Sequence, residues 1–291
     1  MWPALELAIA TALEHPFRID RQQPLGSHAG GTSYGLQGSG QHFFVKLGDL
    51  KAADRLSTEG QALKIIADSQ TIGVPRPVTW GVHGDAAYLV MEWLEFSRPL
   101  PESPYWLGEQ LAAMHRVTAV QFGWHSTNTI GETLQLNGWY TDWVDFYRSQ
   151  RLEMQLRLAR SRGYGGAKQA ERLLEHLDTL FKGYTPAPSL LHGDLWSGNC
   201  GYGQQGQPFI FDPALYYGDR ETDIAMTELF GGFPAAFYES YEAHFPMDGG
   251  YVQRRPLYQL YHLLNHLNIF GQSYAGQVER VLRQCLDYAG L

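Results

Sequence analysis

A change in the pattern of apolar residues constrains the fold of this chain more than any other feature. The first third contains short alternating runs broken by glycines, including a Gly-Ser-Gly turn at residues 38–40, as is typical of antiparallel hairpins. After Ser97 the pattern is helical, with a small embedded hairpin. The order predicts an α+β protein with an N-terminal antiparallel sheet lobe, residues 1–94, a larger, mainly helical lobe, residues 95–291, and a ligand cleft between them.

Length and composition indicate a globular protein without nucleic-acid or membrane partners. The 291 residues indicate about two domains, and 44% hydrophobic residues supply a sizeable core. The net charge of −8 argues against sequence-independent nucleic-acid binding, which needs clustered positive charge. No apolar run approaches the roughly 20 residues of a membrane helix, and the N-terminal segment has no basic region typical of a signal peptide. We expect a cytoplasmic protein; the oligomeric state is open, with a monomer favoured.

Lys46 and Glu59 form the first candidate functional pair. Alternation in the strand that contains Lys46 places Phe44 and Lys46 on one face. In the helix expected over residues 54–67, the spacing places Glu59 on the apolar stripe, where a carboxylate costs free energy unless it is paired. Such a Lys–Glu pair orients the ammonium toward nucleotide phosphates in protein kinases. The alternative is a solvated lysine and a glutamate at the edge of the stripe.

A glycine-rich turn precedes the strand of Lys46. The stretch GSHAGGTSYG begins at Gly26, lacks the full protein-kinase glycine pattern, and no P-loop motif occurs in the chain. Backbone N–H groups of such turns can bind phosphate, and a plain hairpin turn is the alternative. The position of the turn makes four residues candidates for phosphate binding: Gly30, Gly31, Thr32 and Ser33.

The stretch LLHGDLWSGNC, residues 190–200, carries the second group of candidates. It places Asn199 five residues after Asp194, and Asp212 ends the apolar run FIFDP. This order is the one that a phosphoryl-transfer site needs: one aspartate accepts the proton of the acceptor hydroxyl, and the asparagine and the second aspartate hold Mg²⁺. Each residue alone is common in turns, but the joint spacing rarely arises by chance.

An acidic patch and a tryptophan lie close to these residues in the sequence. Asp223 is expected to cap a helix or to hydrogen-bond the back of the Asp194 loop. Asp219 and Glu221 either face a cationic acceptor or are solvated. Trp196 either walls the acceptor pocket or packs in the core.

Two further pairs of residues carry weaker signals. His262 and His266 stand four residues apart in a helical pattern, but no third zinc ligand accompanies them, so we expect histidines on the helix surface. Cys200 and Cys285 are too few for a disulfide framework or a zinc motif, and we expect buried reduced thiols.

The chain resembles the fructosamine kinase (ketosamine-3-kinase) family over nearly its whole length. The resemblance rests on LLHGDLWSGNC, on FIFDPALYYGDRETDIAMTELFGGF and on FGWHSTNTIGETLQLNGWYTDWVDFYRSQRLEMQL. It implies a bilobal protein-kinase-like fold with a nucleotide-binding N-terminal lobe and a catalytic, acceptor-binding C-terminal lobe. The wider relatives are aminoglycoside phosphotransferases and choline kinases. Some family members carry a cysteine in the glycine-rich loop; this chain does not, so redox control through that loop is not expected.

The resemblance also implies an activity and a set of roles. It implies that ATP and Mg²⁺ are used to phosphorylate the 3-hydroxyl of a small-molecule or protein-bound ketosamine, whose phosphate then decomposes and frees the amine. Asp194 would be the base, with Asn199 and Asp212 as Mg²⁺ ligands and Lys46, paired with Glu59, orienting the phosphates. The hinge, whose backbone meets adenine, would consist of Met91, Glu92, Trp93 and Leu94. The rival functions are an aminoglycoside- or choline-type phosphotransferase and a nucleotide-binding pseudokinase.

Overall fold

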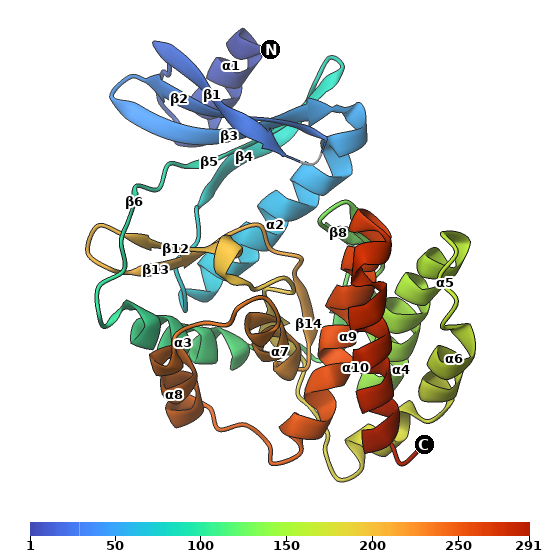
Figure 1. The fold of residues 1–291 in the computed structure, drawn as a ribbon. Helices are drawn as coiled ribbons and strands as arrows, with labels where there is room; N and C mark the ends of the chain where they lie inside the picture. The colour runs from blue at the N-terminus through green and yellow to red at the C-terminus, as the bar shows by residue number, and fades with distance from the viewer. Residues whose placement is uncertain (29) are drawn as a thin grey trace. The chain divides into compact units, whose positions relative to one another are not determined.

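The computed structural model describes residues 1–28 and 30–291, so Ala29 of the glycine-rich turn lies outside the described residues. The chain forms two compact units (Figure 1). Unit 1 comprises Met1–Ser103 and Cys200–Pro213, and unit 2 comprises Pro104–Asn199 and Ala214–Leu291. This division differs from the expected lobes, 1–94 and 95–291. The reason is that strand β6 (Phe96–Ser97) pairs with β12 (Cys200–Gly203), which brings both segments into unit 1.

Unit 1 is built on a five-stranded antiparallel sheet with strand order β1-β2-β3-β5-β4. The strands are β1 (Arg21–His28), β2 (Gly31–Gly38), β3 (Gln41–Asp49), β4 (Pro77–His83) and β5 (Ala86–Glu92). The expected hairpin at residues 38–40 is present, because Gly38 pairs with Gln41. Ser39 (φ 50°) and Gly40 (φ 76°) both have left-handed backbones, which is the geometry that two-residue hairpin turns favour.

Two helices cover the faces of this sheet: α1 (Trp2–Leu13) and α2 (Ala53–Ser69). Successive residues of a strand point to opposite faces. Val90 of β5 accordingly packs in a fully buried cluster with Leu5 of α1, whereas Leu89 faces α2. At Gly60 of α2 a Cβ atom would lie 2.8 Å from the Trp80 ring, so this glycine allows α2 to approach the sheet closely.

A smaller sheet completes unit 1, with strand order β13-β12-β6, where β13 is Pro208–Ile210. The amide of Ile210 donates to the carbonyl of Gly73, just beyond α2, at 2.9 Å. At Gly73 a Cβ atom would lie 2.6 Å from the Pro208 carbonyl oxygen, so the close approach requires glycine here. This contact fixes the end of β13 within unit 1, immediately before Asp212.

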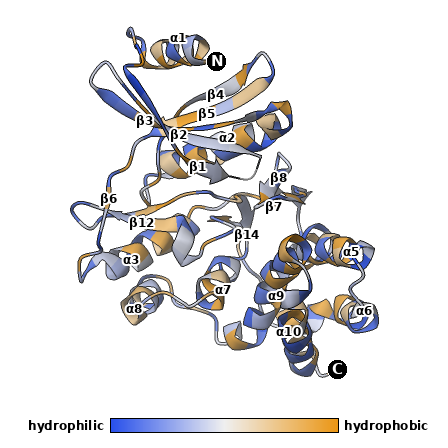
Figure 2. Ribbon diagram, turned by 45° about the horizontal axis from the view of Figure 1, so that its top comes forward, coloured by the Kyte–Doolittle hydropathy of each residue, from blue (hydrophilic) through white to orange (hydrophobic). Residues whose placement is uncertain are grey.

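Unit 2 is mainly helical. Its α-helices are α3 (Ser103–His115, with its first residue in unit 1), α4 (Trp143–Phe146), α5 (Glu153–Ser161), α6 (Ala167–Glu175), α7 (Glu221–Leu229), α8 (Ala235–His244), α9 (Tyr251–Phe270) and α10 (Ala275–Tyr288). The short helices are the π-helix η2 (Tyr147–Leu152) and the 3₁₀ helices η3 (Leu177–Phe181), η4 (Ser197–Asn199) and η5 (Gln272–Tyr274), and unit 1 contains η1 (Leu50–Ala52). Figure 2 shows hydrophobic and hydrophilic residues interleaved along α10, which packs on α9.

Unit 2 also contains short strands, of which the sequence predicted only the one at Ser189–Leu191, as part of the embedded hairpin. They are β7 (Phe122–Trp124), β10 (Gly138–Tyr140), β11 (Ser189–Leu191) and β14 (Tyr216–Gly218) in one sheet, and β8 (Asn128–Ile130) and β9 (Thr133–Gln135) in a hairpin. The helical pattern that the sequence shows after Ser97 includes Trp139, but Trp139 lies in β10 and α4 begins only at Trp143. The physical reason is Asp142, whose side chain accepts a hydrogen bond from the amide of Asp145 and caps the helix.

The sheet unit and the helical unit together confirm the α+β class. In the described part of the chain no helix has the length and apolarity needed to cross a membrane. The two cysteines are free thiols, of which Cys285 is buried, as expected. Cys200 is only partly buried, and burial raises the pKa of its thiol to about 12.

Candidate active site

Lys46 of β3 lies between two carboxylates, all three residues belonging to unit 1. Its Nζ donates to Glu59 Oε1 and to Asp212 Oδ1, each at 2.6 Å. The side chains of Lys46 and Glu59 are 11% and 12% exposed, and that of Asp212 is 53% exposed. The expected Lys46–Glu59 pair is therefore present, and the solvated alternative for Lys46 is wrong.

The local folding of β3 and α2 explains this placement. Phe43 and Val45 of β3 are buried in the cluster that includes α1, so Phe44 and Lys46 point to the opposite face, toward α2. Burial alone would lower the pKa of Lys46, but Glu59 and Asp212 raise it above its ordinary value. Burial raises the pKa of Glu59, and the ammonium of Lys46 opposes this effect. The lysine is therefore charged at neutral pH, with its charge compensated inside the fold.

Asp212 has a backbone conformation that is uncommon for residues other than glycine. Its φ of 57° lies in the left-handed region, which costs a non-glycine residue about 1–3 kcal/mol. Such strain persists only where the surrounding structure imposes it. Here Pro213 follows, β13 is fixed before it, and the side chain is bound to Lys46. The strained backbone holds a half-exposed carboxylate beside a buried ammonium.

A cavity of about 910 Å³ adjoins this cluster within unit 1. The predicted hinge residues that line it are Met91, Glu92, Trp93 and Leu94. Among the predicted phosphate-binding residues, Ser33 lines the cavity, and Gly31 and Thr32 also belong to strand β2. Gly30, with φ 72°, precedes that strand, and a Cβ there would lie 3.3 Å from the Arg55 guanidinium. Nucleotide binding by these residues stays a prediction.

The loop that carries Asp194 and Asn199 lies in unit 2. It follows β11 and turns at Gly193, whose φ is 82° and where a Cβ atom would lie 2.1 Å from the Ala214 carbonyl oxygen. The side-chain amide of Asn199 donates to the carbonyl oxygen of Asp194 at 2.9 Å. Because this amide nitrogen donates, the amide oxygen of Asn199 is the atom suited to bind a metal.

Asp223 of α7 holds this loop from behind, as one of its two expected roles required. Its carboxylate accepts hydrogen bonds from the amides of His192 (2.7 Å) and Gly193 (2.8 Å), and His115 Nε2 lies 3.1 Å from it. The capping alternative is wrong, because α7 begins at Glu221 and Asp223 lies inside its first turn. Burial alone would raise the pKa of Asp223, but these hydrogen bonds and the nearby histidines hold it below its ordinary value.

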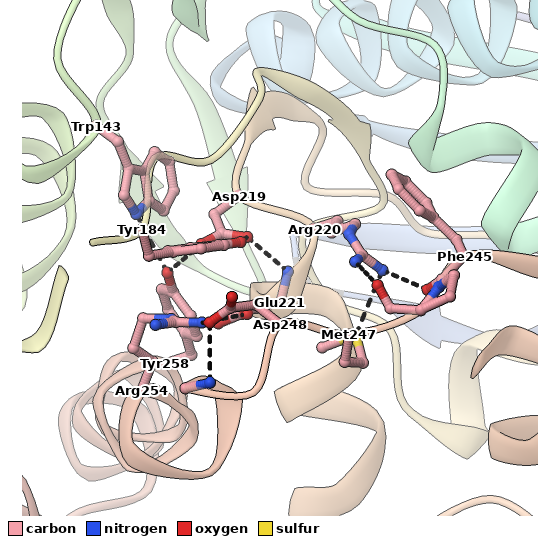
Figure 3. A network of polar contacts seen from close by, with 12 residues as sticks. Trp143, Tyr184, Asp219, Arg220, Glu221, Phe245, Met247, Asp248, Arg254 and Tyr258 are labelled. Carbon is pink, nitrogen blue, oxygen red and sulfur yellow. Dashed lines mark hydrogen bonds and ion pairs between the residues drawn. The ribbon is translucent and has the colours of Figure 1, made fainter. Parts of the chain in front are cut away.

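Asp219 and Glu221 are fully buried, so the solvated alternative is wrong. Asp219 accepts hydrogen bonds from the hydroxyls of Tyr184 (3.0 Å) and Tyr258 (2.6 Å), as Figure 3 shows. Glu221 binds Arg254 through two hydrogen bonds of 2.8 Å. Burial raises the pKa of Glu221 to about 7, and Arg254 opposes this. A role in acceptor binding stays a prediction, which this burial does not support.

The structure decides between the two alternatives for Trp196 and contradicts the surface position expected for His262. Trp196 is 39% exposed, so the core alternative is wrong, and its ring lies against Gly198, where a Cβ would be 2.2 Å away. His262 is only 3% exposed, and its Nδ1 lies 3.9 Å from Asp194 Oδ1. The described residues contain no cluster of three or more His, Cys, Asp or Glu side chains that could hold a metal. The sequence analysis considered His262 only as a zinc ligand or a surface histidine, and it did not consider Arg254. The signal that could have indicated their burial is the helical spacing that they share with buried residues of α9.

The structure thus brings the predicted residues together in two groups. Lys46, Glu59 and Asp212 form one group in unit 1. Asp194 and Asn199 form the other in unit 2. An ammonium held by carboxylates can bind phosphate oxygens, and a positioned aspartate can accept a proton from a hydroxyl.

Comparison with solved structures defines the class of this protein. A crystal structure described as that of a "putative fructosamine-3-kinase" from Haemophilus somnus matches with a TM-score of 0.90 and 28% identity over 98% of both chains. Aminoglycoside phosphotransferase APH(4)-Ia, in a ternary complex with ADP and hygromycin B, matches with a TM-score of 0.65 over 97% of this chain and 98% of that chain. At 16% identity the second likeness shows the fold alone. The fold is the protein-kinase-like fold of small-molecule phosphotransferases.

Comparison with protein families identifies the chain more closely. The family model for fructosamine kinase matches residues 1–288. A protein of Synechocystis described as a probable ketoamine kinase is 44% identical over 286 residues, which cover 98% of this chain and 97% of that protein. One of the same description from Escherichia coli K12 is 36% identical over 291 residues, covering 99% and 98%. The chain belongs to the fructosamine kinase family and is an ATP-dependent phosphotransferase.

The buried ion pair predicts a specific pattern of stabilities. Lys46→Met should lower the free energy of unfolding by about 3–5 kcal/mol, because it leaves the buried carboxylate of Glu59 uncompensated. Lys46→Met/Glu59→Leu should recover most of this loss and remain inactive. Urea denaturation measures both. In the control Lys64→Met, which removes an exposed ion pair with Asp68, the change should be about 0.5 kcal/mol or less. Equal effects of Lys46→Met and Lys64→Met would contradict the prediction.

The lowered pKa of Asp223 predicts how stability depends on pH. The ionised form is favoured by folding, so its contribution is complete above the unfolded-state pKa of about 3.9 and is lost as pH falls through the lower folded-state pKa. Asp223→Asn should cost about 2–4 kcal/mol at pH 7, because one carboxylate oxygen becomes a donor facing a backbone amide. Denaturation of both proteins between pH 7 and about pH 3 should show this difference shrinking in acid. A difference that stays constant over this pH range would refute the assignment.

Proposed function

We propose that this protein transfers the γ-phosphoryl group of ATP to the 3-hydroxyl of a ketosamine, free or attached to a protein, and so initiates deglycation. The observation that carries the proposal is Lys46, buried and bound by Glu59 and Asp212, beside a cavity lined by the predicted hinge residues. Membership of the fructosamine kinase family and the ketoamine kinase names of its relatives support this acceptor class. Because the reaction uses ATP, we place the protein in the cytoplasm.

Each residue has a role in the proposed reaction. Asp194 takes the proton of the acceptor hydroxyl as its oxygen attacks the γ-phosphorus, and the bond from that phosphorus to the oxygen of ADP breaks. Lys46 binds the phosphate oxygens, and Glu59 keeps it oriented. The backbone of Gly30, Gly31, Thr32 and Ser33 covers the phosphates. The position of Ser33 in the lining of the cavity supports this role. Trp196, which is partly exposed, walls the acceptor site.

The donor set fits a magnesium ion bound together with ATP. Asp212 supplies a half-exposed carboxylate, and Asn199 supplies an amide oxygen. Mg²⁺ prefers one or two such protein ligands, with phosphate oxygens and waters for the rest. When bound, the ion neutralises charge on the phosphate oxygens. Asp212 has a second function independent of the metal, because it also fixes Lys46.

Steady-state turnover of Asp194→Asn tests the assigned base. With MgATP and a fructosamine acceptor, kcat should fall by about 10²–10⁴-fold, because the amide cannot accept the proton. The affinity for MgATP, measured by calorimetry, should stay at the wild-type value, which controls for folding. Wild-type turnover by the purified variant would show that Asp194 is not the base.

The same assay identifies the acceptor when it is run on the wild-type protein. The panel contains fructosamines, ribulosamines and erythrulosamines, an aminoglycoside and choline, with release of ADP and the mass of the product as readouts. A ketosamine that gains one phosphoryl group supports the proposal. Phosphorylation of only the aminoglycoside or choline overturns the acceptor class, and MgATP binding without any product indicates a pseudokinase.

A further inference from the structure

His262 carries a buried polar atom that the rest of the described chain does not satisfy. The residue lies on α9 and is 3% exposed, and its Nδ1 has no hydrogen-bond partner among the described residues. Such an atom costs about 1–3 kcal/mol of stability and is rare in folded proteins. A group that remains unsatisfied at this cost calls for a functional explanation.

The position of this atom supplies one. Nδ1 of His262 lies 3.9 Å from Oδ1 of Asp194, and both residues belong to unit 2. The backbone around Asp194 is already fixed, since Asp223 binds the amides before it and Asn199 binds its carbonyl. The carboxylate oxygen Oδ1 of Asp194 is the atom of this loop that lies near Nδ1 of His262. The gap exceeds a normal hydrogen bond by about 1 Å, a distance that a small movement of the side chain closes.

The chemistry of a neutral imidazole suits this task. A charged imidazolium would pair with Asp194 and weaken it as a base, whereas a neutral N–H orients the carboxylate and leaves it basic. Burial lowers the pKa of His262 to about 3, and the charge of His266 adds to this, so the ring is neutral at pH 7. Asp223 of α7 opposes this shift, and Arg151 of η2 adds to it. The carboxylate of Asp194, 3.9 Å from Nδ1, also favours the charged ring.

We propose that His262 is a positioning residue for phosphoryl transfer, whose Nδ1–H donates to the carboxylate of Asp194 when the acceptor binds. The inference rests on the proposed function, because it needs Asp194 as the base. Hydrogen bonds of catalytic groups are often long in the free enzyme and shorten in the complex with substrate. In that complex His262 would orient the carboxylate of Asp194, while Asp223 and Asn199 hold the backbone of the same loop.

Two substitutions of His262 separate positioning from packing. His262→Leu fills the space without a donor, and His262→Asn places an amide N–H near the position of Nδ1. His262→Leu should lower kcat by about 10–10²-fold, because small misplacement of a reacting group has effects of this size, while KM for ATP stays unchanged. His262→Asn should recover most of kcat. The control is His266→Leu, one turn further along α9, which should leave kcat unchanged.

The outcomes decide between the possibilities. Folded His262→Leu with wild-type kcat, or equal losses in His262→Leu and His262→Asn, would overturn the inference. If His262→Leu does not fold, His262→Asn is compared with His262→Gln, whose amide extends beyond the position of Nδ1. Equal kcat values in these two variants would overturn the inference. A lower kcat in His262→Gln alone would support it. Asp194→Asn, assayed in parallel, separates this inference from the proposed function. If Asp194→Asn is inactive while His262→Leu has wild-type kcat, only the role of His262 is wrong. If Asp194→Asn is fully active, the assignment of Asp194 as the base is wrong as well.

Discussion

The account of this protein depends on one interaction, the ammonium of Lys46 held between the carboxylates of Glu59 and Asp212. A buried charge is tolerated only with such partners, and Asp212 is 166 residues away from Lys46 in the sequence. The chain must therefore return to unit 1 to deliver it. It does so as the segment Cys200–Pro213, anchored to Gly73, and this explains why unit 1 is discontinuous. The strained backbone of Asp212 fits the same requirement.

Buried carboxylates organise unit 2 in a similar way. Asp223 accepts hydrogen bonds from backbone amides and so sets the path of the loop before Asp194. Asp219 and Glu221 are bound by tyrosine hydroxyls and by Arg254 (Figure 3). Asp219, Glu221 and Asp223, which follow β14, are thus buried and bound by partners within unit 2. Their carboxylates are not exposed to a polycationic acceptor.

The sequence predicted those features that follow from local periodicity. The period of the strand and the period of the helix were enough to predict that Lys46 and Glu59 pair. The reason is that the strand face of Lys46 and the helix face of Glu59 are both set by residues close in sequence. The burial of Asp219 and His262 was not predictable, since it depends on helices that pack from distant parts of the chain. Strands of three residues such as β7 are too short to show a period, and only their pairing with other short strands defines them.

The most direct test is a crystal structure of the protein with Mg²⁺ and a non-hydrolysable ATP analogue. The account predicts Nζ of Lys46 within hydrogen-bond distance of the phosphate oxygens, and oxygens of Asp212 and Asn199 at about 2.0–2.1 Å from the same Mg²⁺. It also predicts the carboxylate of Asp194 on the side of the γ-phosphate that faces the acceptor. A triphosphate bound away from Lys46, or a metal bound without Asn199, would contradict it.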